Sequence, residues 1–451
     1  MSGGLIIWKY SSYSRVNEAK LYGDLIGEFK CMGNKYFESI IGYRSIKLEV
    51  SRILDQLINP DKYSALGVTE PHGLLFHGVP GVGKSTFANA VVESSGRTVF
   101  ICRKDKSNGD FVNNIVHIFD KAVENTPSII LLDDLDKFAN EDERRRDAEE
   151  FVTVQACIDK VKDKRVFVVA TANNINKLPE SLIRAGRFDH VLELKSPSGK
   201  DAEDIVAHYL EKKPFVVDID VKLTARLMEG RSCAELESVI NQAGTYAAFD
   251  GRGIVEMKDM IKAILRIVFK APESFDDNAA ALPMVACHEA GHALVAELLE
   301  PGSVNLVTAL NHDSFAGGVA SIHRDEMYFY SKKMMENRVM YILAGRAATE
   351  ICYGTIDTGA MSDLKRAFDI VHRFVDDYCS HGFGQFVFDA KVSNEALDRR
   401  DSKVAAEMEN FYAKTKQLLL ENKDKLDKLI ARLVEEKTLL GEQVMQIIKC
   451  A

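Results

Sequence analysis

Residues 78–85 read Gly-Val-Pro-Gly-Val-Gly-Lys-Ser and constrain the fold more than any other stretch of the chain. The apolar residues 73–77 precede this loop, and residues 86–93, which have helical character, follow it. A strand, a glycine-rich loop and a helix in this order are typical of a phosphate-binding loop. Its backbone N–H groups converge on phosphate oxygens, and the helix amino terminus adds partial positive charge. The segment predicts an α/β nucleotide-binding domain, and a glycine-rich turn without a ligand is the alternative.

The residue types in this loop predict ATP with Mg²⁺ as the bound cofactor. Lys84 has the position of the lysine that reaches the β- and γ-phosphates, and Ser85 that of the hydroxyl that coordinates Mg²⁺. The residues that we expect to line the phosphate site are Gly78, Pro80, Gly81, Val82, Gly83, Lys84, Ser85 and Thr86.

Two further apolar segments end in polar residues and predict buried strands of a parallel sheet. Residues 128–134 end in Asp133 and Asp134, and residues 165–173 end in Asn173. Doubly wound sheets carry their ligand chemistry at the carboxyl ends of the strands. We expect Asp133 to hold Mg²⁺, directly or through water, and Asp134 to polarise the attacking water. The alternatives are a solvated loop for the two acids and a turn-forming role for Asn173, which can otherwise orient the hydrolytic water.

A pair of arginines and a helical region follow these strands. Arg184 and Arg187 lie three residues apart, and in a ring of subunits they can enter a neighbour's nucleotide site as arginine fingers. Salt bridges at the surface are the alternative. Residues 201–270 predict several short helices, which favours a helical lid over the nucleotide, and the polar residues 271–278 make a plausible domain boundary.

A second motif, His-Glu-Ala-Gly-His at residues 288–292, lies inside an apolar segment that predicts a buried helix. Helix positions i and i+4 share one face, so His288 and His292 project side by side. Two imidazoles at this spacing can hold Zn²⁺, with Glu289 as the general base for a water that the metal activates. A core helix that happens to carry two histidines is the alternative.

Beyond this motif the pattern predicts a mostly helical region. Residues 317–322 suggest a short strand whose free edge can pair with an extended peptide, and residues 327–353 suggest a helix. The segment Ala-Gly-Arg-Ala-Ala at residues 344–348 allows close contact with another helix. Asp363 opens a later helix, where an acid interacting with the helix dipole is the simplest explanation. The amphipathic spacing near the end of the chain is typical of packing or subunit contact.

Length and composition limit the remaining choices. A chain of 451 residues is too long for one ordinary domain, and about three domains are expected. The net charge of -9 gives no electrostatic reason to expect a nucleic-acid partner. Eight scattered cysteines without a Cys-x-x-Cys pair favour a reducing compartment. No run approaches the ~18 apolar residues of a membrane helix, so we expect no membrane insertion and a cytoplasmic location, with an organelle matrix as the alternative.

Together these segments resemble the FtsH-type AAA+ zinc metalloproteases, from about residue 36 to the carboxyl terminus and in the family's order. The resemblance implies an α/β AAA+ P-loop domain, with a parallel sheet and a helical lid, followed by a mostly α-helical zinc metallopeptidase domain. It also implies a homo-hexamer with a central pore that acts on polypeptides. The expected division is residues 1–35 as an amino-terminal extension, 36–195 as the large ATPase subdomain, 196–270 as the lid and 271–451 as the peptidase.

The resemblance also assigns roles to single residues. It makes His288, His292 and Asp363 the metal ligands and Glu289 the base. In the nucleotide half, it implies that Asn173 is the sensor and that Arg187 and Arg184 are the fingers. The residues that it places against adenine are Ile40, Ile41 and Gly42.

Three departures from the family pattern affect these expectations. The membrane helices that the family usually carries near its start have no counterpart here, so the chain looks like a soluble relative. The acid-ended strand finishes Asp133-Asp134 where the family has Asp-Glu. The side chain of Asp134 is one methylene shorter than glutamate, so its carboxylate lies farther from the attacking water, which can slow ATP hydrolysis. The aromatic-Val-Gly pore motif has no clear counterpart; Phe111-Val112 is the nearest candidate, with Lys104 and Lys106 nearby.

The leading hypothesis is therefore an ATP-dependent zinc endopeptidase that unfolds or translocates proteins and degrades them. One alternative is a remodelling ATPase with an inactive peptidase half, against which the intact metal motif argues. The other is a zinc peptidase of unfolded chains with a weak regulatory motor, which rests on Asp134 and the altered pore loop.

Overall fold

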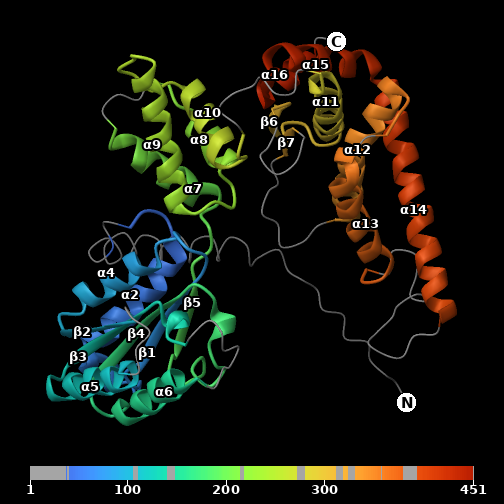
Figure 1. Cartoon of the computed structure of the whole chain (residues 1–451). Coiled ribbons are helices and arrows are strands. Elements are labelled where there is room, and N and C mark those ends of the chain that lie inside the picture. The colour runs from blue at the N-terminus through green and yellow to red at the C-terminus, as the bar shows by residue number, and fades with distance from the viewer. Residues whose placement is uncertain are drawn as a thin grey trace, which may run out of the picture. The chain divides into compact units, whose positions relative to one another are not determined.

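The computed structural model of the chain describes ten stretches of residues: 37, 40–104, 110–139, 148–213, 218–271, 280–310, 318–322, 331–356, 358–378 and 394–449 (Figure 1). The chain divides into two compact units. The first unit comprises residues 1–214 and 229–238, and the second comprises residues 215–228 and 239–451. The expected extension over residues 1–35 and the expected boundary at residues 272–278 lie outside the described residues.

The first unit is built on a parallel sheet with the strand order β2-β3-β4-β1-β5. Its strands are β1 (Gly73–His77), β2 (Thr98–Arg103), β3 (Ser128–Asp133), β4 (Val166–Ala172) and β5 (His190–Glu193). Its helices are α2 (Arg44–Ile58), α3 (Pro60–Ser64), α4 (Lys84–Ser94), α5 (Phe111–Glu124), α6 (Glu149–Val161) and α7 (Gly199–Glu211). This arrangement confirms the predicted α/β fold with a parallel sheet.

Helices cover both faces of this sheet, which explains why its central strands are buried along almost their whole length. Every residue of β4 is buried, as is β3 up to Asp133. Figure 1 shows α5 and α6 on one face and α2 and α4 on the other. On the face of α4, the rings of Phe76 and Phe87 lie 5.7 Å apart. The sheet therefore holds the loops at its carboxyl edge on a rigid base.

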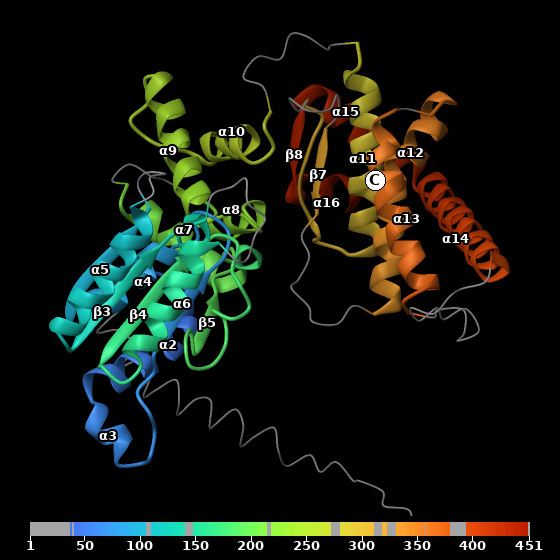
Figure 2. The same cartoon turned by 60° about the horizontal axis from the view of Figure 1, so that its bottom comes forward.

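The second unit is mostly helical. Helix α9 (Cys233–Phe249) passes from the first unit into it. Its other helices are α8 (Val221–Leu227), α10 (Met257–Ile267), α11 (Leu282–Leu299), α12 (Lys332–Tyr353), α13 (Met361–Val375), α14 (Asn394–Glu421), α15 (Lys423–Glu436) and α16 (Gly441–Lys449). A small antiparallel sheet in the order β7-β6-β8 contains β6 (Val304–Thr308), β7 (Val319–Ile322) and β8 (Thr438–Leu440). Figure 2 shows β7 alongside α11.

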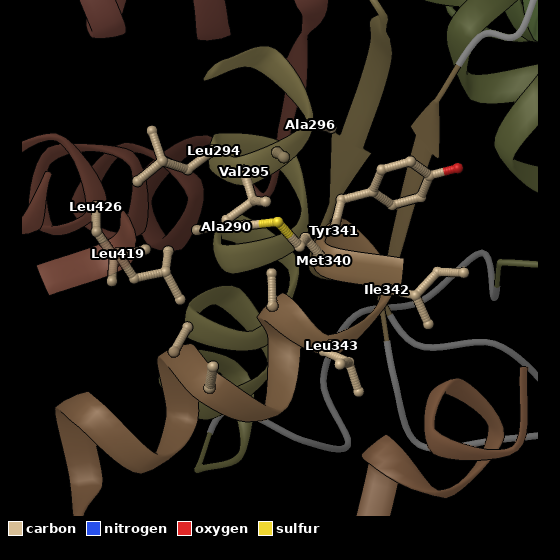
Figure 3. Packing of buried hydrophobic residues seen from close by; sticks show 14 of the residues in the cluster. Ala290, Leu294, Val295, Ala296, Met340, Tyr341, Ile342, Leu343, Leu419 and Leu426 are labelled. Atoms are coloured by element: carbon tan, nitrogen blue, oxygen red, sulfur yellow. The ribbon is translucent and has the colours of Figure 1, made fainter. Parts of the chain in front are cut away.

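Helix α11 forms the centre of the second unit because nearly all of its surface is buried. Its residues 286–297 are all buried, so neighbouring elements enclose the helix on every side. Figure 3 shows Leu294 and Val295 of α11 packed between α12, which contributes Met340, and the carboxyl-terminal helices, which contribute Leu419 and Leu426. The predicted buried helix is confirmed, and the stripe of leucines near the chain end packs inside this unit.

The strands β2, β5, β6 and β8 were not anticipated from the sequence. The predicted strands at 73–77, 128–134, 165–173 and 317–322 correspond to β1, β3, β4 and β7, although Gly317 lies outside the described residues. Of the helices that the structure describes, none is long and apolar enough to span a bilayer.

Candidate functional site

Three side chains from two helices converge in the second unit and form a candidate metal centre. The Nε2 atoms of His288 and His292 lie 3.0 Å apart, and each lies 3.3 Å from Oδ2 of Asp363. Ligand atoms around a tetrahedral zinc ion, each about 2.0–2.1 Å from the metal, are separated by about 3.3 Å. The three atoms therefore have the spacing of zinc ligands, and the group is the one set of such residues found within the described part of the chain.

The helices bring these ligands together by close packing. His288 and His292 share one face of α11, and Asp363 lies in the first turn of α13, so the fold supplies the proximity that sequence spacing alone does not. Two glycines allow the contact with α12. A Cβ on Gly345 would lie 2.4 Å from both Nε2 atoms, and a Cβ on Gly291 would lie 2.5 Å from the Ala344 carbonyl oxygen. The expected close helix contact at residues 344–348 is confirmed.

The surroundings of His292 and Asp363 favour the forms of these side chains that can bind a metal. Nδ1 of His292 donates to the carbonyl oxygen of Tyr341 at 2.6 Å, because a carbonyl only accepts, and this leaves the Nε2 lone pair for a metal. Burial raises the pKa of the Asp363 carboxyl, but its contacts with His288 and His292 outweigh burial. The pKa of Asp363 is thus held well below its usual range. A carboxylate and two imidazoles that converge in this way are a donor set that fits a zinc ion.

Glu289 is fully enclosed next to these ligands. Its side chain is 6% exposed, and burial raises the pKa of its carboxyl, while the charges of the two imidazoles oppose the rise. The backbone N–H of Ala320 in β7 donates to this carboxylate. β7 can approach so closely because Gly318 has no side chain: a Cβ there would lie 2.6 Å from Cγ of Glu289. The environment suits a proton acceptor beside the metal.

The phosphate-binding loop of the first unit has the backbone that phosphate binding requires. Gly78, Gly81 and Gly83 all have positive φ angles, of 147°, 80° and 95°, which residues with side chains rarely adopt. The loop leads from β1 into the first turn of α4. Nζ of Lys84 donates to the carbonyl oxygens of Gly78 and Val79, at 2.9 Å each, and so lies folded over the loop.

The predicted acids and amide meet at the same edge of the sheet, because β4 lies between β3 and β1. Nδ2 of Asn173 donates to Oδ1 of Asp134 at 3.2 Å, and Nζ of Lys137 donates to Oδ2 of Asp134 at 2.8 Å. Burial raises the pKa of Asp134, but these two bonds outweigh it, so the pKa is lowered and the group is a carboxylate at neutral pH. Thr171 donates to Oδ1 of Asp133 at 2.8 Å and orients that carboxylate.

Comparisons with known proteins match both halves of the chain. Residues 74–196 match the profile of the ATPase family associated with various cellular activities (AAA), and residues 278–447 match that of Peptidase family M41. The ATP-dependent zinc metalloprotease FtsH of Thermus thermophilus is 30% identical over 445 residues, which cover 92% of this chain and 70% of that protein. The chain belongs to the FtsH family of ATP-dependent zinc metalloproteases.

Further relatives show the same extent of similarity. The ATP-dependent zinc metalloprotease FtsH 2 of a Thermoanaerobacter species is 27% identical over 429 residues, 91% of this chain and 82% of the relative. FtsH 1 of the same organism is 30% identical over 448 residues, 91% of this chain and 72% of the relative. Because both catalytic halves lie inside these matches, neither the interpretation as a remodelling ATPase nor that as a peptidase with a weak motor is favoured.

The two candidate arginine fingers of this FtsH-family chain have different surroundings. Arg187 is buried, and its guanidinium donates to Oδ2 of Asp159 at 2.7 Å and to the carbonyl oxygen of Ser181 at 2.5 Å. Arg184 is exposed, and no hydrogen bond or ion pair of its side chain occurs among the described residues. Arg187 is thus paired within this chain, whereas Arg184 is exposed.

The segment that the resemblance places against adenine packs onto the helix that follows the phosphate loop. Ile40 and Gly42 are buried and Ile41 is half-buried. The ring of Tyr43, the next residue, meets the ring of Phe87 in α4 edge to face, with centroids 5.8 Å apart. These contacts join the segment to α4, and its position against adenine stays a prediction.

Phe111 was the nearest candidate for the aromatic residue of a pore loop, and the structure contradicts this assignment. Its ring is 6% exposed and packs edge to face on Phe138, with centroids 4.9 Å apart, while Nζ of Lys104 lies over it at 5.6 Å. A core side chain of α5 cannot grip a polypeptide, so Phe111 is not the missing aromatic. Lys106 lies outside the described residues.

Three supporting residues were missed by sequence reasoning. Thr171 bonds both acids at the end of β3: its hydroxyl donates to Oδ1 of Asp133 and accepts from the backbone N–H of Asp134, at 2.8 Å each. Asp136 accepts the backbone N–H of Asn173 at 2.9 Å, and Gly318 opens space for Glu289. A threonine inside an otherwise apolar strand was the available signal for Thr171; the other two contacts depend on the fold.

Proposed function

We propose that this FtsH-family chain cleaves polypeptides at a zinc ion held by His288, His292 and Asp363, with ATP hydrolysis at the phosphate loop driving substrate delivery. Its cofactors are Zn²⁺, ATP and Mg²⁺. The observation that carries the proposal is the convergence of the three ligand atoms, at 3.0–3.3 Å, beside the enclosed carboxyl of Glu289.

Peptide hydrolysis depends on where protons are held in this site. When bound, zinc supplies Lewis acidity that polarises the scissile carbonyl and favours loss of a proton from water. Glu289 accepts this proton on a carboxylate oxygen and returns it to the leaving amine, and its raised pKa brings it closer to neutral pH for both steps. His292 keeps Nε2 available because Nδ1 is bonded to Tyr341.

The substrate backbone is expected along β7. This strand pairs with β6 on one side only, in the order β7-β6-β8, and its residue Ala320 contacts Glu289. An extended peptide can add to such an edge by main-chain hydrogen bonds. The edge position therefore favours a scissile bond next to the base.

ATP hydrolysis is assigned to the carboxyl edge of the first unit's sheet. Lys84 binds the β- and γ-phosphates, and Ser85 and Asp133 are the residues that would hold Mg²⁺. Asp134 polarises the attacking water and Asn173 orients it through their mutual hydrogen bond. The other phosphate-loop residues and the adenine segment at residues 40–42 complete the site.

We propose a homo-hexamer, in which each nucleotide site is completed by a neighbour. Arg184, which is exposed, is then the finger, and Arg187 positions it through the hydrogen bond from its backbone N–H to the carbonyl oxygen of Arg184 at 3.2 Å. This proposal keeps the predicted division of the chain. Residues 1–35 are an amino-terminal extension, 36–195 the large subdomain, 196–270 the lid and 271–451 the peptidase. The substrates are polypeptides, without a nucleic-acid partner or membrane insertion, in the cytoplasm or an organelle matrix.

Two substitutions separate the peptidase from the motor. Glu289→Gln removes the base and should lower casein cleavage by at least about 100-fold while ATP turnover is retained. Lys84→Ala should abolish ATP turnover and spare cleavage of a short peptide. A chelator should abolish cleavage of the short peptide by the wild type and by Lys84→Ala, and zinc should restore it in both. Unchanged proteolysis in Glu289→Gln would refute the zinc mechanism.

The strength of the motor is tested by comparing a stably folded substrate with an unfolded one. Each is incubated with ATP and with a non-hydrolysable analogue. We expect loss of the folded substrate only with ATP. Loss of the unfolded substrate alone, with either nucleotide, would instead establish a peptidase with a weak motor. This rival hypothesis is worth testing because Phe111 is a core residue and cannot grip a substrate.

A further inference from the structure

The second unit contains two cysteines on neighbouring helices, Cys287 of α11 and Cys352 in the last turn of α12. Cys287 is fully buried and Cys352 is half-buried, and both are free thiols. Both contribute to the apolar core of this unit. Neither belongs to the candidate metal centre of His288, His292 and Asp363, so the proposed mechanism gives this pair no role.

The helices α11 and α12 touch along their backbones and run antiparallel. A Cβ on Gly291 of α11 would lie 2.6 Å from Cβ of Ala348 in α12. His292, the next residue of α11, bonds the carbonyl oxygen of Tyr341, which lies two turns before Ala348. A step toward the amino end of α11 therefore leads toward the carboxyl end of α12.

This packing brings the two thiols together. Cys287 lies one turn before Gly291, and Cys352 lies one turn after Ala348, each on the same face of its helix. Because the helices are antiparallel, both steps lead to the same place. The thiols of Cys287 and Cys352 form a side-chain hydrogen bond with each other. Lys423 of α15 interacts electrostatically with both sulfur atoms, which supports their placement in one site.

The pair meets the geometric conditions for a disulfide. Two cysteines can be bridged when their Cα atoms lie within about 7 Å and their Cβ atoms point toward each other. Helices in contact at Gly291 meet the first condition, and hydrogen-bonded sulfurs meet the second. Cys102 and Cys157 in the core of the first unit differ, since no hydrogen bond between these two thiols occurs among the described residues.

We infer that Cys287 and Cys352 are a redox-sensitive dithiol, which a peroxide oxidises to a disulfide that ties α11 to α12. Cys352 reacts first because it is the more exposed. Its sulfur attacks one oxygen of hydrogen peroxide, the O–O bond breaks, and a sulfenic acid and a water molecule form. The Cys287 sulfur then attacks the sulfenic sulfur, the S–O bond breaks, and a second water leaves with the thiol proton. Two thiols are oxidised, and one peroxide is reduced to two waters.

The disulfide restrains the helix that carries both candidate zinc-binding histidines. Neighbouring residues of a helix point about 100° apart, so Cys287 is bridged to α12 while His288 still faces the metal centre. The bond also closes the chain between α11 and the end of α12 into a loop, which restricts the unfolded state. In a reducing compartment the thiols stay free until an oxidant arrives. None of these steps depends on the proposed function.

The test maps the cross-link in the full chain loaded with zinc. The protein is treated with increasing hydrogen peroxide, its remaining thiols are alkylated, and its proteolytic peptides are identified by mass. We expect one linked pair of peptides that contains Cys287 and Cys352 and that dithiothreitol separates. Cys287→Ala and Cys352→Ala should each abolish the link. Cys157→Ala, at a buried cysteine of the first unit, is the matched control and should retain it.

Oxidation should raise the unfolding temperature of the second unit by roughly 5–10 °C, and dithiothreitol should reverse the rise. Cys352→Ala should show no rise. In Cys287→Ala, peroxide should carry Cys352 on to a sulfinic acid, because no thiol remains to resolve the sulfenic acid. Sulfinic acid at Cys352 of the wild type in place of the link would overturn the inference. A link that leaves the unfolding temperature unchanged would overturn the restraint of α11, whereas a linked chain that never cleaves casein would refute only the proposed function.

Discussion

Gly345 of α12 lies so close to His288 of α11 that a Cβ on the glycine would be 2.4 Å from the imidazole Nε2 and 2.6 Å from Cδ2. The same Cβ would lie 2.4 Å from Nε2 of His292. Non-bonded carbon and nitrogen atoms do not approach to such distances. The absence of one side chain on α12 thus allows the two imidazoles to converge.

Gly345→Ala is expected to displace both imidazoles and destroy the metal centre. Because the methyl group meets both metal-binding nitrogens, we expect zinc affinity to fall by at least about 100-fold and casein cleavage to fall with it. ATP turnover should stay within about twofold of wild type. Zinc content after dialysis against a competing chelator measures the first effect.

The matched control for this variant is Gly244→Ala, at a helical glycine of α9 around which a Cβ meets nothing within 4 Å. It should keep its zinc and its proteolysis. If Gly345→Ala also retained a full equivalent of zinc, the close contact would not shape the centre as described.

Arg184→Ala and Arg187→Ala are expected to lower ATP turnover for different reasons. Loss of a finger costs about 1,000-fold or more in kcat. Arg184→Ala should show this loss without a change in the unfolding temperature, because its side chain is exposed. Arg187→Ala should lower the free energy of unfolding by about 2 kcal/mol, since it removes several hydrogen bonds from a buried guanidinium.

Thermal unfolding and ATPase assays on both variants separate these effects, with the exposed Arg52→Ala in α2 as a control that should change neither. Full ATP turnover in Arg184→Ala would show that this residue is no finger.

Phe111→Leu is expected to affect stability and leave substrate transport intact. The buried ring packs on Phe138, so its replacement should lower the free energy of unfolding by about 1–2 kcal/mol. ATP consumed per peptide bond cleaved should match wild type. Phe119→Leu, which alters another buried ring of α5, should behave alike. A collapse of ATP-dependent degradation in Phe111→Leu alone, with stability unchanged, would restore Phe111 as a gripping residue.

Local patterns predicted the elements whose chemistry is local. The phosphate loop between β1 and α4 could be predicted because an apolar run and a glycine-rich turn follow each other directly in the sequence. His288 and His292 project together because helix geometry alone sets their spacing. In both cases the functional atoms lie within one turn or one loop of each other, so no tertiary information was needed.

Contacts between distant segments were not visible in the sequence. β8 has three residues, too few to show strand alternation, and pairs with β6 more than a hundred residues earlier, through Leu306 and Leu440. The contact of Asp363 with the histidines followed from family resemblance and not from spacing. Phe111 had the right residue type for a pore loop, but only the packing of α5 on Phe138 reveals that it is core.

The ion pair between Arg187 and Asp159 predicts a dependence of stability on pH. Arg187 first, and then Lys162, holds the pKa of the Asp159 carboxyl well below its usual range. A carboxyl whose pKa is lower in the folded state stabilises the fold above its unfolded pKa of about 4, and the stabilisation is lost as the pH falls through the folded pKa. Asp159→Asn should therefore destabilise the first unit at neutral pH, by about 1 kcal/mol after allowance for solvent around a side chain 41% exposed.

Chemical denaturation of wild type and Asp159→Asn at successive pH values measures this difference. It should be constant from neutral pH to about pH 5 and should shrink below about pH 4, because the wild-type carboxyl then begins to lose the advantage of its charge. Asp163→Asn, at an exposed acid in the turn after α6, should show little difference from wild type at any pH. A difference for Asp159→Asn that is as large at about pH 3 as at neutral pH would mean that the charge of Asp159 is not what holds Arg187 in place.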